Sequence, residues 1–437
     1  SSAASDVYKR QIYNLLLPVF CLLAAPAWVI KMARRGGLDW RLLQRIGIYR
    51  DRPDKEDRHT VYVHAVSVGE IRMALRLITR WKQRDPLMRF VVAATTSTGF
   101  QVAEREALEG VRVIYSPLDL PPLLRSVFRR FKPVLIVLID SEIWPNLLHV
   151  SSRRQIPVAL ANARLSDRSA RRYQRIRTIA EPMLNQINIV CVQAEEHVES
   201  WRKIGISPER LVITGSLKFD LDGVQVPIKR AEFKDMLDSF GCGRPIVLAA
   251  STHHGEERLI AEAVGEVPGA LAVLLPRHVE RRQAVVSELE TAGFEVVLRS
   301  RFRAPEKPKA AVLLVDSTGE LGDWTALADV VVIGKSFLGR GGQNPVEAIL
   351  VDAPVVCGPD MSNFEPLASE LRAVSAIECV SQSKLADTLR AILVSDQRRQ
   401  SLTKSARAVI DKHRGSTDRI IAQLSTLMEG SADKHQG

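Results

Sequence analysis

Short apolar runs alternate with amphipathic stretches along most of the chain. In the first half, nearly continuous apolar runs lie at residues 61–66, 90–95, 111–116, 134–139, 157–162, 189–194 and 211–216. Amphipathic stretches such as 70–84, 121–131 and 168–187 lie between them. Strands covered on both faces have this continuous apolar character, and their alternation with helices is typical of parallel sheets. The pattern predicts a doubly wound α/β domain.

The alternation stops at residues 220–243, which are mostly polar and charged, and then starts again. The second set of apolar runs lies at residues 245–250, 269–276, 294–300, 310–316, 328–334 and 353–358. The sequence therefore predicts two Rossmann-like doubly wound domains facing a cleft, with ligands at the carboxyl ends of the strands. We expect an N-terminal domain over 33–222, a linker over 223–243 and a C-terminal domain over 244–430.

A different pattern occupies the amino terminus. We expect residues 1–11 to be a non-native leader, because they start without Met and show no periodicity. Residues 12–30 carry no formal charge, and basic residues follow from Lys31 onward. As a helix this segment is about 28 Å long, close to the thickness of a bilayer core. Three interpretations are open: a membrane anchor over 12–32 with a cytoplasmic basic flank, a helix lying in the interface or buried in protein, and a cleaved signal peptide.

Composition narrows the class of protein. The 437 residues are 46% hydrophobic and 25% charged, which is typical of globular proteins and excludes disordered or fibrous ones. The net charge of +11 favours anionic partners, whether phosphorylated metabolites, an acidic membrane surface or nucleic acid. The five cysteines form no CxxC pair, and no zinc-ligand spacing is present. This pattern favours reduced thiols in a cytosolic compartment.

Acidic motifs follow two apolar runs of the first half. In the HAVSVGE motif, Gly69 permits a tight turn and Glu70 falls in the first turn of the next helix. There the carboxylate serves either as a general base or as a partner of the helix dipole. Asp140 and Glu142 follow the fourth run, where carboxylates are costly unless they are paired or functional. Capping of the next helix by Asp140 or Ser141 explains part of this pattern.

Cationic motifs follow two further runs. Arg164 and Ser166 in NARLSDRS suit the capture of a phosphate or carboxylate. Lys218 in TGSLKFD is a candidate for stabilising an anion, although an exposed lysine is the commoner case.

The second half carries glycine-rich and basic motifs. Arg277 in PRH is suited to pair with a phosphate or carboxylate. The STGEL and GGQNPVEA segments place glycines at helix starts, where free N–H groups bind phosphate, and Glu347 is suited to hold a ribose hydroxyl. The GxGxxG and Walker A patterns are absent, which disfavours dehydrogenases and P-loop enzymes.

Taken in order, HAVSVGE, EIWPN, NARLSDRS, TGSLKFD, the STHHGEE run, PRH and the STGEL and GGQNPVEA pair resemble the Kdo (3-deoxy-D-manno-octulosonic acid) transferases of lipopolysaccharide synthesis. The resemblance covers nearly the whole chain from residue 12. It implies a GT-B fold, an acceptor-binding first domain, a nucleotide-sugar-binding second domain and an inner-membrane anchor with a cytoplasmic catalytic body. It also implies CMP-Kdo as donor and the phosphorylated lipid A precursor as acceptor. The implied partners include the anionic inner-membrane surface but no nucleic acid, and no cofactor or metal is expected.

The resemblance assigns roles to individual residues. It implies Glu70 as the general base, with Lys218 and Asp140 assisting the transition state. The implied CMP contacts are Pro276, Arg277, Thr318, Gly319, Glu320, Asn344, Pro345, Val346 and Glu347. The candidate substrate-binding residues are Ser67, Gly69, Arg164 and Ser166.

Three positions depart from the family pattern. Asp140 stands where the family usually has Glu, so Glu142 is a candidate to share its role. Lys335 replaces a glycine and Gln343 a histidine, both near the implied donor pocket. We expect altered donor contacts or a compensated site.

The expected reaction is a direct displacement that inverts the anomeric carbon of Kdo. Two alternatives are open. One is another GT-B transferase or epimerase with a UDP donor. The other is a membrane-tethered binding protein that has lost activity, which the three departures alone support.

Overall fold

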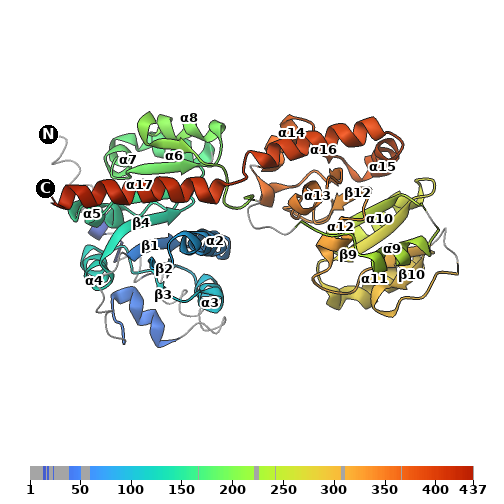
Figure 1. The fold of residues 1–437 in the computed structure, drawn as a ribbon, viewed down its shortest axis with the longest axis horizontal. Helices are drawn as coiled ribbons and strands as arrows, with labels where there is room; N and C mark the ends of the chain where they lie inside the picture. The colour runs from blue at the N-terminus through green and yellow to red at the C-terminus, as the bar shows by residue number, and fades with distance from the viewer. Residues whose placement is uncertain are drawn as a thin grey trace. The chain divides into compact units, whose positions relative to one another are not determined.

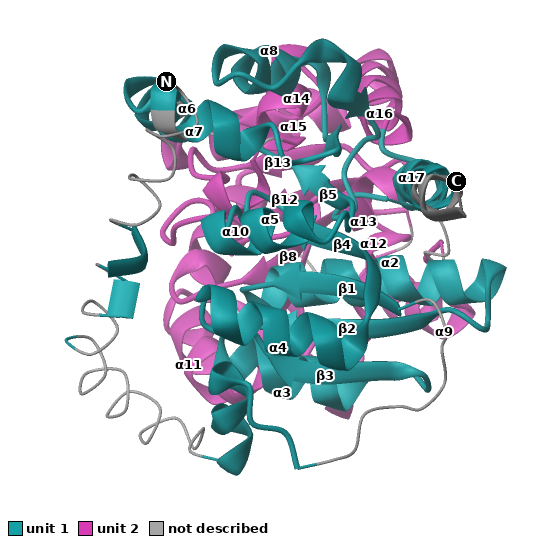
Figure 2. Ribbon diagram, turned by 90° about the vertical axis from the view of Figure 1, so that its left-hand side faces the viewer, with its two compact units in different colours: residues 1–222, 413–437 teal, residues 223–412 magenta. Residues whose placement is uncertain are grey.

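A computed structural model of the protein shows two compact units (Figures 1 and 2). It describes residues 39–50, 60–165, 167–220, 226–241, 243–306, 311–365 and 367–436, with short pieces at 13–15, 17–18 and 23. The predicted leader over 1–11, most of the predicted anchor over 12–32 and the candidate residue Ser166 lie outside the described residues. Within the described part, no helix combines the length and apolarity needed to cross a membrane.

The chain leaves the first unit and returns to it. Unit 1 comprises residues 1–222 and 413–437, and unit 2 comprises residues 223–412. Figure 2 shows the last helix in the colour of unit 1. The sequence pattern extended the second domain to residue 430. That part of the prediction is wrong for residues 413–430, because they pack on the first sheet.

Unit 1 is built on a parallel sheet of seven strands in the order β3-β2-β1-β4-β5-β6-β7. The strands are β1 Thr60–Ala65, β2 Arg89–Ala94, β3 Val111–Tyr115, β4 Pro133–Ile139, β5 Val158–Ala163, β6 Ile189–Val192 and β7 Leu211–Ile213. The helices are α2 Val68–Arg84, α3 Ser97–Glu106, α4 Pro121–Phe131, α5 Pro145–Arg153, α6 Asp167–Arg175, α7 Arg177–Leu184, α8 Glu195–Lys203 and α17 Ser416–Gln436. Each of the seven apolar runs forms a strand, as predicted.

Both faces of this sheet are buried, which is why its strands are continuously apolar. Along β1, Val61 and Val63 point to the face covered by α2, α3 and α17. Tyr62 points to the opposite face, which α4, α5, α7 and α8 cover. Successive side chains of a strand alternate between faces, so every position must be apolar when both are covered.

Unit 2 has a second parallel sheet of seven strands in the order β10-β11-β9-β8-β12-β13-β14. The strands are β8 Ile246–Thr252, β9 Leu271–Pro276, β10 Glu295–Leu298, β11 Ala311–Leu314, β12 Val330–Ile333, β13 Val355–Cys357 and β14 Glu378–Cys379. The helices are α9 Ala231–Asp238, α10 Glu256–Gly265, α11 Arg282–Thr291, α12 Leu321–Thr325, α13 Val346–Leu350, α14 Leu367–Ala373, α15 Leu385–Leu393 and α16 Asp396–Asp411. The six predicted runs are all strands. The edge strand β14 was missed because it has only two residues.

The C-terminal helix α17 is held by both apolar and polar contacts. Its residues Ile420 and Leu424 are buried in the same core cluster as the β1 side chains. At its start, the buried Asp220 accepts hydrogen bonds from the backbone N–H groups of Gly415 at 2.9 Å and Thr417 at 2.6 Å. Asp220 is the last residue of the TGSLKFD motif, so that motif anchors the returning chain.

We therefore predict that Asp220→Ala destabilises unit 1 by about 2 kcal/mol, because a buried and a part-buried N–H group at the start of α17 lose their acceptor. Hydrogen exchange of the α17 amides measures this effect, together with denaturant unfolding. The control Asp387→Ala removes a carboxylate that is exposed on α15 and should change stability by less than about 0.5 kcal/mol. Exchange of α17 at the wild-type rate in Asp220→Ala would contradict the capping role.

Candidate functional site

The candidate residues of unit 1 lie where its strand order reverses. The order changes direction between β1 and β4, and doubly wound sheets bind ligands at this point, outside the carboxyl ends of the strands. Glu70 comes shortly after β1, and Asp140 directly follows β4. Two of the three predicted catalytic carboxylates therefore follow the two strands that flank the reversal.

Glu70 belongs to a capping box at the start of α2. Ser67 is the N-cap, and its Oγ accepts a hydrogen bond from the Glu70 backbone N–H at 3.2 Å. The Glu70 carboxylate in turn accepts from Ser67 Oγ at 2.7 Å and from the Val66 N–H at 2.8 Å. This reciprocal pattern stabilises a helix start, and the helix dipole favours negative charge there. The Glu70 carboxylate is therefore held in one position at the start of α2, and both its role as a base and its pairing with the helix dipole are compatible with this geometry.

Gly69 differs from its prediction. It lies inside the first turn of α2 rather than in a tight turn before the helix. Its φ is not in the left-handed region, so its backbone does not require glycine. A side chain at this position has room, because an added Cβ would meet only Ser67 Oγ, at 3.8 Å.

Asp140 and Glu142 are carboxyls with raised pKa values. Burial raises the pKa of Asp140 to about 6, and the charge of Glu70 adds to the rise. Burial raises the pKa of Glu142 to about 7, again with help from Glu70, while a 3.1 Å hydrogen bond from Trp144 Nε1 opposes the rise. The three carboxyl groups are thus close enough to repel one another. Strongly shifted carboxyls at the end of a buried strand are typical of functional sites.

Two cations complete the cluster. Arg164 and Lys218 both lower the pKa of Asp140, so both lie within electrostatic reach of its carboxylate. Burial lowers the pKa of Lys218, as does the nearby Arg164, whereas Asp140 raises it. The structure therefore brings together the predicted catalytic residues of three motifs and the predicted substrate-binding residue Arg164 of a fourth. We call this the unit 1 cluster; its residues are Glu70, Asp140, Glu142, Arg164 and Lys218.

The buried side-chain amide of Asn162, which no sequence pattern indicated, connects these motifs. Asn162 Nδ2 donates to Asp140 Oδ1 at 3.1 Å, and Asn162 Oδ1 accepts from the Leu217 N–H at 2.9 Å. Gln193 Nε2 also donates to the Asn162 carbonyl oxygen, at 2.9 Å. Asn162 has a φ of +60°, a conformation that asparagine tolerates better than most residues. It thereby fixes the positions of Asp140 and of the turn that carries Lys218.

In unit 2 the strand order reverses between β8 and β12, and two buried glutamates of the STHHGEE run brace the loops there. Glu256 is fully buried and accepts from the backbone N–H groups of His253 at 2.9 Å and Lys335 at 2.5 Å. Glu257 accepts from Arg281 Nη1 at 3.1 Å. These two carboxylates are therefore used to hold the loops in place.

The two departures from the family pattern in unit 2 lie beside the same histidine. Gln343 Nε2 is 3.1 Å from His253 Nε2. Burial lowers the pKa of His253, and the positive charges of Lys335 and His278 lower it further. The His253 and His278 rings are 5.8 Å apart, edge to face. Three motifs of the second half, after β8, β9 and β12, therefore meet here.

The STGEL residues surround the start of α12. Gly319 has a φ of +83°, which explains the glycine, and Thr318 precedes it. The Glu320 carboxylate accepts from Ser317 Oγ at 2.6 Å and from Trp324 Nε1 at 3.2 Å. Glu320 is thus engaged within its own loop.

The GGQNPVEA residues surround the start of α13, next to α12. Asn344 Oδ1 accepts from the Val346 N–H at 3.1 Å, and Pro345 is the N-cap. The half-buried Glu347 faces α12, since a Cβ added to Gly322 would lie 3.9 Å from Glu347 Oε2. Burial raises the pKa of Glu347, and in the described part of the chain no group donates a hydrogen bond to its carboxylate.

The remaining donor candidates lie at the end of β9. Pro276 is the last residue of that strand, and Arg277 follows it with an exposed side chain. The Arg277 backbone N–H donates to the Thr252 carbonyl at 3.0 Å, which joins the ends of β9 and β8.

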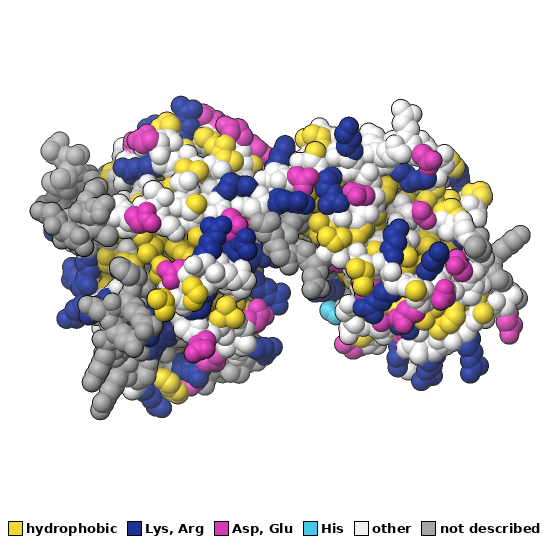
Figure 3. Space-filling view, viewed as in Figure 1, with side chains coloured by type: hydrophobic (Ala, Val, Ile, Leu, Met, Phe, Trp, Pro, Cys, Tyr) yellow, Lys and Arg dark blue, Asp and Glu magenta, His cyan; other side chains and the backbone are white. Residues whose placement is uncertain are grey.

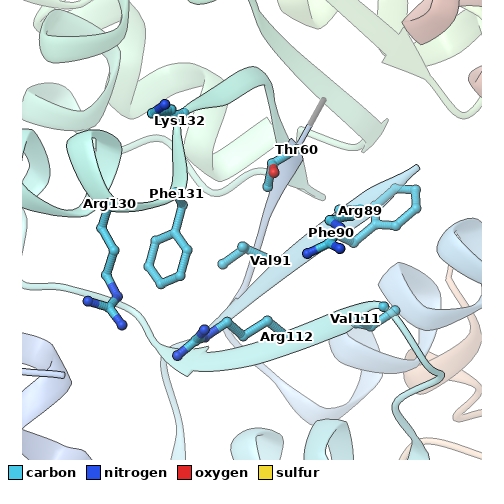
Figure 4. Close-up of a pocket in the computed structure, with 10 residues that line it drawn as sticks. Thr60, Arg89, Phe90, Val91, Val111, Arg112, Arg130, Phe131 and Lys132 are labelled. Atoms are coloured by element: carbon cyan, nitrogen blue, oxygen red, sulfur yellow. The ribbon is translucent and has the colours of Figure 1, made fainter. Parts of the chain in front are cut away.

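A basic cavity of about 260 Å³ lies at the other end of the first sheet (Figure 4). Thr60, Arg89 and Val111 line it, and they begin β1, β2 and β3. The guanidinium groups of Arg112 and Arg130 lie 5.4 and 5.6 Å from the centre of the Phe131 ring. The cavity is therefore separate from the unit 1 cluster, which lies at the carboxyl ends. Among the described residues, no group of three or more His, Cys, Asp or Glu side chains is placed to hold a metal ion.

Comparison with known proteins identifies the family. The sequence profile described as 3-deoxy-D-manno-octulosonic-acid transferase (kdotransferase) matches residues 40–221. The 3-deoxy-D-manno-octulosonic acid transferase of Haemophilus influenzae is 31% identical, over 89% of this chain and 92% of its own. That of Bordetella pertussis is 32% identical, over 95% of this chain and 98% of its own. The chain belongs to the Kdo transferase family.

Solved structures show that this Kdo transferase family member shares its fold with proteins of much lower sequence identity. The UDP-GlcNAc 2-epimerase of Neisseria meningitidis matches with a TM-score of 0.54 and 12% identity, over 84% of this chain and 99% of that one. MurG of Acinetobacter baumannii matches with a TM-score of 0.53, also at 12% identity, with the same shares of the two chains. The predicted α/β architecture of GT-B type is confirmed to the extent of two parallel sheets and GT-B-like relatives.

The raised pKa of Glu142 predicts a pH-dependent stability. Glu142 takes up its proton near pH 7 in the folded protein but near its ordinary value of about 4.3 in the unfolded chain. Between these values the folded protein binds more protons, so the free energy of unfolding falls as the pH rises. We expect Glu142→Gln to remove this penalty, so that its stability relative to wild type is greater at pH 8 than at pH 5.

Denaturant unfolding of both proteins at several pH values measures the difference. Glu280→Gln is the matched control, because the Glu280 side chain is exposed in unit 2. A difference between Glu142→Gln and wild type that stays constant from pH 5 to pH 8 would contradict the prediction.

Proposed function

We propose that this protein transfers Kdo from CMP-Kdo to a hydroxyl of the phosphorylated lipid A precursor, with inversion at the anomeric carbon. Membership of the Kdo transferase family supports the reaction class. The observation that carries the proposal is the unit 1 cluster, in which three carboxyls and two cations from four motifs gather at the reversal of the sheet.

Glu70 is the proposed general base. Its carboxylate lies at the start of α2, where the helix dipole and two hydrogen bonds hold it. A base in a fixed position needs little reorganisation to accept a proton. In the proposed step the acceptor hydroxyl gives its proton to Glu70, its oxygen attacks the anomeric carbon of Kdo, and the bond to the CMP phosphate breaks.

The other residues of the unit 1 cluster are suited to balance the negative charges of the substrates and to form hydrogen bonds with them. Lys218 and Arg164 are cations beside buried carboxyls, so they are placed to balance the carboxylate of Kdo or a phosphate of the acceptor. Asp140 and Glu142 have pKa values near neutrality, at which a carboxyl can donate as well as accept a hydrogen bond. We propose that Asp140 acts on the transition state despite its shorter side chain, and that Glu142 shares this role.

The donor is proposed to bind in unit 2. Glu347 is half-buried and has no donor group among the described residues, so a ribose hydroxyl can supply the missing hydrogen bond. The glycine-rich turn before α13 and the exposed Arg277 are suited to the phosphate. Transfer then requires the sugar held by unit 2 to reach Glu70 of unit 1.

The proposed place of action is the cytoplasmic face of the inner membrane. The apolar segment 12–32 is the proposed anchor, with its basic flank toward anionic lipid. Lys and Arg side chains are also spread over the face drawn in Figure 3, among acidic ones. Both features suit a phosphorylated lipid acceptor and an anionic membrane surface.

We predict that Glu70→Gln lowers kcat for Kdo transfer by about 10²–10⁴-fold, because Gln cannot accept the proton. Gln retains an oxygen for the capping box, so the melting temperature should change little. The assay follows CMP release from CMP-Kdo with a lipid A precursor as acceptor. Glu106→Gln, the same chemical change in an exposed residue at the end of α3, should leave the rate unchanged.

Near-normal transfer by a folded Glu70→Gln variant would remove Glu70 as the base. Absence of CMP release by the wild-type protein, with UDP-sugars accepted instead, would overturn the proposed donor.

A second prediction concerns Glu347. We expect Glu347→Gln to weaken CMP binding about 10–100-fold, because a hydrogen bond to a charged carboxylate is lost. The free energy of unfolding should not fall, since burial already disfavours the charged form of Glu347. Calorimetric titration with CMP and thermal unfolding measure the two effects. Glu266→Gln, in an exposed residue after α10, is the control, and unchanged CMP binding by Glu347→Gln would refute the ribose role.

A further inference from the structure

Two cysteine thiols of unit 2 face each other across neighbouring strands. Cys357 ends β13 and Cys379 ends β14, and the two residues are register partners in this parallel pair. Their sulfur atoms are 3.0 Å apart. Neither residue belongs to the motifs assigned to donor or acceptor binding.

The strand geometry suits a covalent bond between them. Neighbouring strands lie about 4.8 Å apart, and the Cα atoms of disulfide-bonded cysteines are separated by about 4.4–6.8 Å. The backbone spacing of a paired register position therefore falls within the required range. A side-chain movement of about 1 Å brings the sulfurs to bonding distance.

The surroundings make the two thiols unequal. Cys357 is buried, whereas Cys379 is half-exposed on the edge strand. A hydrogen bond from the Cys357 thiol lowers the pKa of Cys379 to about 7, and Arg372 lowers it further, while burial and Glu365 oppose the change. The same hydrogen bond and burial raise the pKa of Cys357. Since the thiolate is the nucleophile, Cys379 is the reactive sulfur and Cys357 the resolving one.

We propose that Cys357 and Cys379 are an oxidation site, at which hydrogen peroxide converts the two thiols into a reversible disulfide. The Cys379 thiolate attacks one peroxide oxygen, the O–O bond breaks, and hydroxide leaves to give a sulfenic acid. Cys357 then attacks the Cys379 sulfur, the S–S bond forms, and the hydroxyl group leaves with the Cys357 proton as water. In total, two thiols are oxidised and one peroxide is reduced to two waters.

The test uses the full chain with Cys21 and Cys242, which lie outside the described residues, replaced by Ser. The reduced protein is treated with hydrogen peroxide, its remaining thiols are alkylated, and its peptides are analysed by mass spectrometry. We expect a linked Cys357–Cys379 peptide that a dithiol reductant separates. Cys191 is an internal control, because burial raises its pKa to about 12 and it should stay reduced.

Two variants separate the roles of the sulfurs. Cys357→Ser should leave a Cys379 sulfenic acid that dimedone traps, whereas Cys379→Ser should leave Cys357 reduced. Thermal unfolding of both variants shows whether they fold. The proposal fails if both cysteines of the parent protein are alkylated after peroxide treatment, or if Cys379 is oxidised to the sulfinic acid with no linked peptide. The test is independent of Kdo transfer.

Discussion

The candidate site depends on buried polar side chains that form hydrogen bonds to several loops at the ends of the strands and so hold these loops together. In unit 1 the amide of Asn162 joins Asp140 to the turn that carries Lys218. In unit 2 the carboxylate of Glu256 receives backbone N–H groups from the loops after β8 and β12. An unpaired polar group at such depth costs about 1–3 kcal/mol, so each loop has one favoured arrangement. The same physical device thus shapes the carboxyl ends of both sheets.

The architecture was predictable because burial on both faces leaves a strong signal. Thirteen apolar runs correspond to thirteen of the strands in the two sheets, and the polar stretch 220–243 marks the passage into unit 2. The two-residue strand β14 leaves no such signal, because its pairing comes from its neighbour β13. The sequence pattern also did not predict that α17 packs on unit 1, because an amphipathic helix does not specify which sheet it covers. The decisive contact is that of Asp220 with the start of α17, nearly two hundred residues away in sequence.

The sequence predicted which residues form the site but not the hydrogen bonds that join them. Motifs after strands indicated Glu70, Asp140, Arg164 and Lys218, because the ends of parallel strands meet at one edge. What joins them could not be read from the pattern, since a buried Asn162 has no periodic signature. The motif also predicted a tight turn at Gly69, but this residue lies within the first turn of α2.

Backbone strain adds an independent argument for these strand ends. Among the described residues, eight that are not glycine have positive φ. Lys132, Gln155, Asp352 and Ser375 come at or just after helix ends, where the left-handed conformation is ordinary. The other four are Asp140, Asn162, Ser251 and Lys335, and they lie at the ends of β4, β5, β8 and β12.

Backbone strain of about 1–3 kcal/mol per residue persists where the surrounding structure enforces it, and such strain concentrates at functional sites. Asparagine and aspartate adopt this left-handed conformation more readily than lysine, so the backbone at Lys335 costs more free energy than a glycine would at this position. What Lys335 adds that glycine lacks is a positive charge within electrostatic reach of His253, whose pKa it lowers.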